Sequence, residues 1–230
     1  MSPVVTVTTC APPPVDRGEV FRYAACRRPG AEEERLLDSC LEELGDRLRY
    51  AVCFTTVPVT AGGGRLDLGF ARVESRDLAR WLDGCREALV FAATTGLELD
   101  RLISRYSRVS PSRALVFQAV GAERIEALCD TFCAARGAEL ARSGRGLTRR
   151  FSPGYGDLPI TLQNQLLDLL DAPRRVGLTA SASHILLPRK SVTAILGISR
   201  RPVAQGARSC VSCPARAGCQ YQKAGGHCGL

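Results

Sequence analysis

Apolar and polar residues alternate with clear helical or strand periods over most of the chain. In residues 31–49, Leu37, Leu41, Leu44 and Leu48 recur at helical spacing and predict an amphipathic helix. The run YAVCFTTVPV that follows is rich in β-branched and aromatic residues, which favour a strand. Helical spacing returns in a long segment that Pro111 opens, up to about residue 142, and again in a leucine-rich segment over 162–170.

Further short apolar runs predict the remaining strands. ALVFAATTG indicates a buried strand, RLDLGFARV after the GGG turn a second strand, and RGLTRRF a short strand that enters a loop. HILLP and SVTAILGIS are predicted to pair with each other. Strands and helices follow one another without a regular βαβ alternation, so the pattern predicts the α+β class.

Changes in the pattern divide the chain into three parts. Residues 1–16 contain a Pro-Pro-Pro run and are predicted to be a disordered lead, and residues 17–199 carry the periodic pattern of one domain. After Ser199 the apolar pattern stops, which makes residues 200–230 a separate tail. The net charge is +8, yet residues 172–230 hold nine basic residues and no acidic one, so the positive excess lies in this quarter and indicates an acidic partner.

Cysteine usage depends on the compartment. The N-terminus shows no basic leader with an apolar core, and no apolar run approaches the roughly 20 residues of a membrane span, so a cytoplasmic location is expected. Disulfides are rare there. Seven of the eleven cysteines are scattered through apolar or helical segments and are predicted to be small buried hydrophobic residues: Cys10, Cys26, Cys40, Cys53, Cys85, Cys129 and Cys133.

The other four cysteines, Cys210, Cys213, Cys219 and Cys228, fall close together in the tail. A CxxC pair followed by two more thiolates suits one zinc ion or an iron–sulfur cluster, and the spacing alone does not distinguish them. His227 is a possible replacement for Cys228 as a ligand. Because the tail has no apolar pattern, a metal would have to supply its folding energy. The alternative is four unligated thiols in a disordered tail.

The segment RFSPGYGDLP, residues 150–159, has the composition of a ligand loop. Its glycines allow a close backbone approach, and its prolines fix neighbouring dihedral angles. Arg150 offers a planar fork for a carboxylate, and Tyr155 offers an aromatic face with a hydroxyl. Together they suit a small zwitterionic ligand with an aromatic part. The alternative is a tight structural turn around a packed tyrosine.

RFSPGYGDLP and the later PRKSVTAILG resemble the activation domain of cobalamin-dependent methionine synthase. They are more similar still to the free-standing bacterial activation subunit, whose pattern is RFSPGYGDxP followed by PxKSVxAIxG. Weaker similarity in EVFRYAAC and GAERIEALCD extends the resemblance over about residues 18–198. It implies an α+β domain with a mixed or antiparallel sheet that binds S-adenosylmethionine.

In this family the domain donates a methyl group from S-adenosylmethionine to the oxidised cobalamin of a methionine synthase or related corrinoid protein, while flavodoxin or a ferredoxin-type donor supplies an electron. The resemblance places Arg150 near the ligand's carboxylate and Glu126, less securely, near its amino group. Ser152 and Gly154 match loop positions whose backbone approaches the ligand, and Tyr155 matches the loop tyrosine. For Glu126 an exposed surface position is the alternative, because glutamate is seldom buried without a partner.

The chain departs from the family where Ser181-Ala182-Ser183 replaces a T-E-S triplet. It also lacks a DxHxxG cobalamin motif, since His184 and His227 lie in other contexts. The cobalamin is therefore expected on the partner, and the chain is expected to be an accessory subunit of a methyltransferase and not a complete enzyme. The rival hypothesis is a non-catalytic zinc-binding protein that binds nucleic acid through its basic tail. The loop and the PRKSV segment count against it, because neither interleaves basic with aromatic residues.

Overall fold

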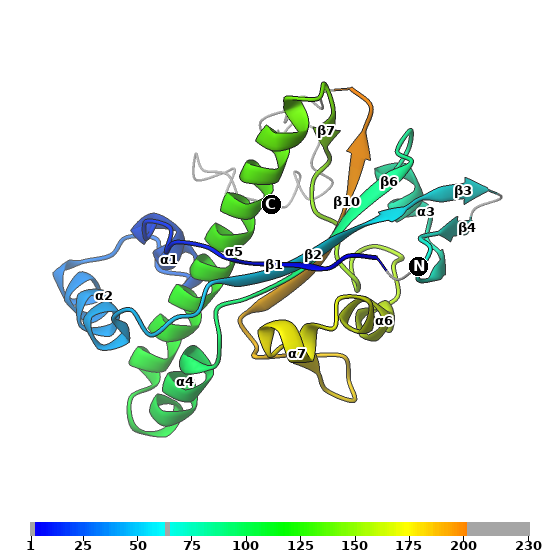
Figure 1. Ribbon diagram of the computed structural model, residues 1–230. Helices are drawn as coiled ribbons and strands as arrows, with labels where there is room; N and C mark the ends of the chain where they lie inside the picture. Colours follow the sequence, from blue (N-terminus) through cyan, green and yellow to red (C-terminus); the bar gives the residue numbers. More distant parts are fainter. Residues whose placement is uncertain (1–2, 63–64, 202–230) are drawn as a thin grey trace.

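The computed structural model describes residues 3–62 and 65–201. Its fold is α+β, and it is built on a five-stranded antiparallel sheet in the order β1-β2-β6-β10-β7 (Figure 1). The class predicted from the sequence is confirmed. The five strands are β1 (Thr6–Thr9), β2 (Ala51–Pro58), β6 (Glu87–Thr94), β10 (Ser191–Ser199) and β7 (Gly146–Leu147).

The central strands are buried on both faces. In β6 every residue after Glu87 is buried, and alternate side chains enter different cores: Val90 faces one and Phe91 the other. Successive side chains of a strand point to opposite sides, so a strand that is covered on both faces reads as a continuous apolar run. This is why ALVFAATTG has no polar alternation.

One face of the sheet is covered by the long helix α5 (Pro111–Ala141), which crosses behind the strands in Figure 1. Leu128 and Phe132 of α5 pack against Val52 and Phe91 of the sheet. The rings of Phe132 and Phe91 lie 5.1 Å apart in a tilted arrangement, which aromatic pairs prefer.

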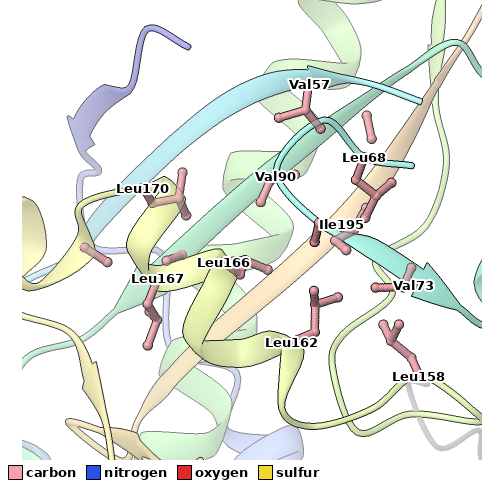
Figure 2. Close-up of a cluster of buried hydrophobic side chains, with 14 of the residues drawn as sticks. Val57, Leu68, Val73, Val90, Leu158, Leu162, Leu166, Leu167, Leu170 and Ile195 are labelled. Carbon is pink, nitrogen blue, oxygen red and sulfur yellow. The ribbon is translucent and has the colours of Figure 1, made fainter. Parts of the chain in front are cut away.

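The other face packs against shorter elements. Leu162 and Leu166 meet Val90 and Ile195 of the sheet in a continuous apolar cluster (Figure 2). The elements on this side are α3 (Arg76–Trp81), α6 (Leu162–Leu169), α7 (Ala172–Val176) and a small antiparallel sheet of β3 (Thr60–Gly62), β4 (Arg65–Asp67) and β5 (Arg72–Glu74). The expected strand RLDLGFARV is thus two short strands around a turn at Gly69, where φ is +77°.

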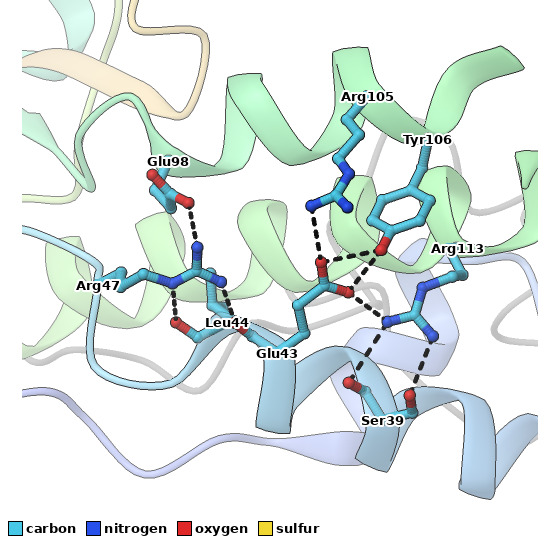
Figure 3. Close-up of polar contacts among 8 residues, drawn as sticks. All are labelled: Ser39, Glu43, Leu44, Arg47, Glu98, Arg105, Tyr106 and Arg113. Carbon is cyan, nitrogen blue, oxygen red and sulfur yellow. Dashed lines mark hydrogen bonds and ion pairs between the residues drawn. The ribbon is translucent and has the colours of Figure 1, made fainter. Parts of the chain in front are cut away.

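Three further helices pack on α5 away from the sheet: α1 (Arg17–Tyr23), α2 (Ala31–Leu44) and α4 (Glu98–Val109). Glu43 of α2 joins them, because it accepts hydrogen bonds from the Tyr106 hydroxyl at 2.9 Å and from Arg113 at 2.5 Å (Figure 3). Arg47 adds an ion pair with Glu98 at 2.5 Å. Helix α2 ends at Leu44, five residues before the predicted end, because Gly45 adopts a φ of +53°.

Two sequence predictions are wrong. The lead that was expected to be disordered, residues 1–16, contains strand β1, which pairs with β2 from Thr6↔Phe54 to Thr9↔Ala51. Its β-branched residues outweigh the nearby prolines. The strands expected to pair with each other also separate: HILLP contributes β9 (Leu186–Leu187), which pairs with β8 (Thr179–Ala180), whereas β10 pairs with β6 and β7.

Candidate functional site

The candidate site begins on the edge of the main sheet beside β10. After β7 the chain continues along β10 as a bridge, in which Phe151 and Ile195 exchange backbone hydrogen bonds of 3.0 and 2.8 Å. Phe151 packs on the α3 side, where its ring lies 5.5 Å from that of Trp81. Its neighbour Arg150 turns to the opposite side of the sheet and meets α5. Because successive side chains of an extended segment point to opposite sides, Arg150 points toward the helix α5.

Arg150 is held between two carboxylates of α5. Its Nη2 donates to Glu126 Oε2 at 2.7 Å and lies 3.0 Å from Asp130 Oδ1. The Arg150 side chain is only 18% exposed, whereas those of Glu126 and Asp130 are 43% and 62% exposed. The other terminal nitrogen of Arg150, Nη1, is buried and has no hydrogen-bond partner among the described residues. A buried cationic donor without a partner is costly, so this nitrogen suits an anionic ligand group.

The loop of residues 152–159 is tied to the start of α3 through Asp157. Its carboxylate accepts hydrogen bonds from the Ser75 hydroxyl at 2.5 Å and from the backbone N–H groups of Arg76 and Asp77 at 2.7 and 3.2 Å. These bonds, the one from Ser75 first, hold the pKa of Asp157 below its usual value. Ser75 in turn caps α3 by accepting a hydrogen bond from Leu78 N–H.

Two glycines give the loop its shape. Gly154 and Gly156 have φ values of +90° and +54°, which other residues rarely adopt. The backbone N–H of Gly154 donates to the Leu158 carbonyl at 2.9 Å, and that of Tyr155 donates to the Ser152 carbonyl at 3.1 Å. Tyr155 is 62% exposed, so it is not the packed tyrosine of a purely structural turn.

Besides the two carboxylates, the neighbours of Arg150 on α5 include the thiols of Cys129 and Cys133. Burial raises the pKa of the Cys129 thiol well above its usual range and that of Cys133 to about 11, although Arg150 acts in the opposite direction on both. Both thiols are therefore protonated at neutral pH. Tyr23 of α1 lies close enough for the Glu126 charge to raise its pKa, after the larger effect of its own burial.

The structure thus brings together two of the predicted site residues, Arg150 and Glu126, and sets Ser152, Gly154 and Tyr155 in the loop that follows Arg150. Sequence reasoning missed Asp130, although its position one turn after Glu126 on a predicted helix was a usable signal.

Sequence reasoning also missed Asp157 as a loop anchor. Its partner Ser75 is 82 residues away, so no local pattern could have shown the contact.

The predicted metal site of Cys210, Cys213, Cys219 and Cys228 lies outside the described residues. Within residues 3–62 and 65–201, no cluster of three or more metal-ligating side chains occurs. The seven scattered cysteines are free thiols there, four buried and three partly buried.

None of the described helices has the length and apolar character that a membrane crossing needs. An open cavity lies apart from Arg150, with a lining that includes Val59, Cys85, Arg86 and Arg200.

Comparison with known proteins finds similarity in structure alone. No protein-family model matches the chain, and no curated protein matches its sequence. A solved structure described as the MetH reactivation domain bound to AdoHcy is similar, with a TM-score of 0.63 and 18% identity over 84% of this chain and 78% of that chain. At this identity the match defines the class of fold: an α+β domain with the fold of the MetH reactivation domain.

Proposed function

We propose that this chain binds S-adenosylmethionine at Arg150, Glu126 and the loop of residues 152–159, and that it supports reductive methylation of a cobalamin held by a partner protein. The main observation that supports this proposal is the 2.7 Å contact between Arg150 and Glu126. By the resemblance of the sequence, Arg150 corresponds to the family's ligand-binding arginine and Glu126, less securely, to its glutamate. They meet in a fold shared with a reactivation domain that was solved with AdoHcy.

The chemistry of the pair suits the amino-acid part of this ligand. The buried Nη1 of Arg150, which has no hydrogen-bond partner in the described part of the chain, can donate a charge-assisted hydrogen bond to a carboxylate. Glu126, 43% exposed, can balance an ammonium group. The exposed Tyr155 ring and the backbone of Ser152 and Gly154 lie in the following loop, which is available for the aromatic part.

S-adenosylmethionine would supply the methyl group: the electron pair of the reduced cobalt forms the new bond to carbon while the carbon–sulfur bond breaks, and a neutral thioether remains. A flavodoxin- or ferredoxin-type donor would supply the electron that returns the oxidised cobalt to its reduced state. The residues of this chain would bind and orient the ligand. The cobalamin would be presented by a methionine synthase or another corrinoid protein.

Calorimetric titration with S-adenosylmethionine tests the proposal. The parent protein should bind, and Arg150→Ala should weaken binding at least about tenfold, because a hydrogen bond to a charged group contributes about 1.5–3 kcal/mol. Arg142→Ala is the matched control, since Arg142 is exposed at the end of α5. An Arg150→Ala protein that melts like the parent and binds equally well would refute this site.

A further inference from the structure

The cluster around Arg150 carries more negative than positive charge. One guanidinium is shared by two carboxylates, and both contact the same Nη2 atom, Glu126 at 2.7 Å and Asp130 at 3.0 Å. Glu126 and Asp130 lie four positions apart on α5, so they project from the same side of the helix. Together the three groups carry one net negative charge.

The two thiols beside Arg150 on α5 add no charge. The thiols of Cys129 and Cys133 remain protonated at neutral pH because burial raises their pKa values. Arg22, which lies over the ring of Tyr23, contacts an acid of its own, Glu19, at 2.5 Å, and Arg136 further along α5 contacts Glu139 at 2.6 Å. Each of these pairs is neutral as a unit.

The ligand and its product differ by one charge. S-adenosylmethionine has a carboxylate, an ammonium and a sulfonium, hence one net positive charge, whereas S-adenosylhomocysteine has lost the sulfonium charge and is neutral overall. In either ligand the carboxylate can pair with Arg150 and the ammonium with Glu126. These two ligand charges cancel, so the sulfonium is the group of the ligand that balances the one net negative charge of Arg150, Glu126 and Asp130.

We infer that Asp130 makes the site selective for the cationic sulfonium ligand over the neutral thioether product. The inference rests on the proposed function, because it concerns the same site. Direct contact with the sulfur is not required, since charges interact within a Debye length of about 8 Å at physiological salt. The preference would help to release the product after methyl transfer and to load a new methyl donor.

The test is a comparison of two dissociation constants, one for each ligand, by calorimetry. The parent should bind S-adenosylmethionine more tightly than S-adenosylhomocysteine. Asp130→Asn should lower this preference about two- to fivefold, mainly through weaker binding of the cation, which is the range expected for a partly exposed charge pair. Asp130→Glu should keep most of it, and Asp46→Asn, which removes an exposed acid in the turn after α2, should leave it unchanged.

Each other outcome has a distinct meaning. If Asp130→Asn weakens both ligands equally, or if the parent binds both equally well, the selectivity is overturned and the proposed function stands. If the parent binds neither ligand, both proposals fail. If Asp130→Asn does not fold, both dissociation constants of the parent are measured over a series of salt concentrations. The preference for S-adenosylmethionine should become smaller as the salt concentration rises. A preference that does not change with salt overturns the inference.

Discussion

The side chain of Lys190 lies across α5 at Gly121. A β-carbon on Gly121 would come within 2.7 Å of Lys190 Cε and 2.9 Å of both Cδ and Cγ. The ammonium beyond these carbons donates to the Gln118 carbonyl at 2.9 Å. A glycine in the middle of a long helix normally costs stability, so its presence here is explained by the close passage of this side chain. Lys190, in the PRKSV segment directly before β10, thereby holds the start of β10 against α5.

Gly121→Ala should therefore destabilise the protein by about 1–3 kcal/mol despite the better helix propensity of alanine, because the lysine chain must move. In a Lys190→Ala background the same change should cost much less, since the obstructing atoms are gone. Urea unfolding of the two single variants and the double variant measures this coupling. Strictly additive effects would contradict the packing described.

Asp157→Asn should loosen the loop and weaken S-adenosylmethionine binding. Hydrogen bonds from Ser75, Arg76 and Asp77 lower the folded-state pKa of Asp157 below its unfolded value of about 3.9. Its stabilising effect is therefore complete above that value and is lost as pH falls through the folded pKa. Unfolding free energies measured from pH 7 downward should fall less steeply below about pH 4 in Asp157→Asn than in the parent. A curve for Asp157→Asn that runs parallel to that of the parent would argue against the anchor.

Arg124→Met should be strongly destabilising, by about 3–5 kcal/mol, because it leaves a buried carboxylate unpaired. Arg124 and Glu123 are 3% and 4% exposed and form an ion pair. Arg124 also donates to the carbonyls of Pro13 and Pro14, and Glu123 accepts from Asp16 N–H at 3.1 Å. Chemical denaturation gives the loss, and protease cleavage near residues 10–16 should become faster.

The matched control for this network is Arg65→Met. Arg65 pairs with Glu74 on the surface, where both side chains are more than 70% exposed. Such exposed pairs contribute at most about 1 kcal/mol, so this variant should remain close to the parent. If Arg124→Met also remained within that range, the buried pair would not hold the N-terminal segment in place.

The tail should carry a metal on Cys210, Cys213, Cys219 and Cys228. Metal analysis of anaerobically purified protein should find zinc or iron, and the visible spectrum distinguishes a colourless zinc site from a brown iron–sulfur cluster. Cys213→Ser should lower the metal content, whereas Cys26→Ser, which changes a partly buried free thiol in the folded domain, should not. Protein without either metal, when both were supplied, would favour four unligated thiols.

Local periodicity was enough to predict the elements that carry most of the core. The apolar run of β6 and the spacing that Pro111 opens in α5 both predicted their element type, because β6 is covered on both faces and α5 packs against the sheet on one side and other helices on the other. Strand partners were not predictable in this way. HILLP and SVTAILGIS are neighbours in sequence, but the register of β10 is set by β6, which lies far upstream.

The site residues that have a distinctive local sequence could be predicted. Those that belong to the site only through contacts with distant segments could not. Arg150 and Tyr155 stand out in a loop of glycines and prolines, and resemblance to a family added Glu126. Asp130 escaped notice because an exposed acid on a helix is ordinary until an arginine from another element meets it. The order of the N-terminal segment was missed for the same kind of reason, since the carbonyls of Pro13 and Pro14, which follow β1, accept hydrogen bonds from Arg124 of α5.

The place of β10 in the sheet determines when the fold can be completed. Ser191 pairs with Thr94, which precedes it by 97 residues, and β10 separates β6 from the edge strand β7. Contacts between such distant segments form slowly, whereas the neighbouring helices α4 and α5 can associate early. Until β10 has been synthesised, one side of β6 remains an unpaired strand edge, which other chains can join. The emerging polypeptide is therefore most prone to aggregation after β6 has formed and before β10 arrives.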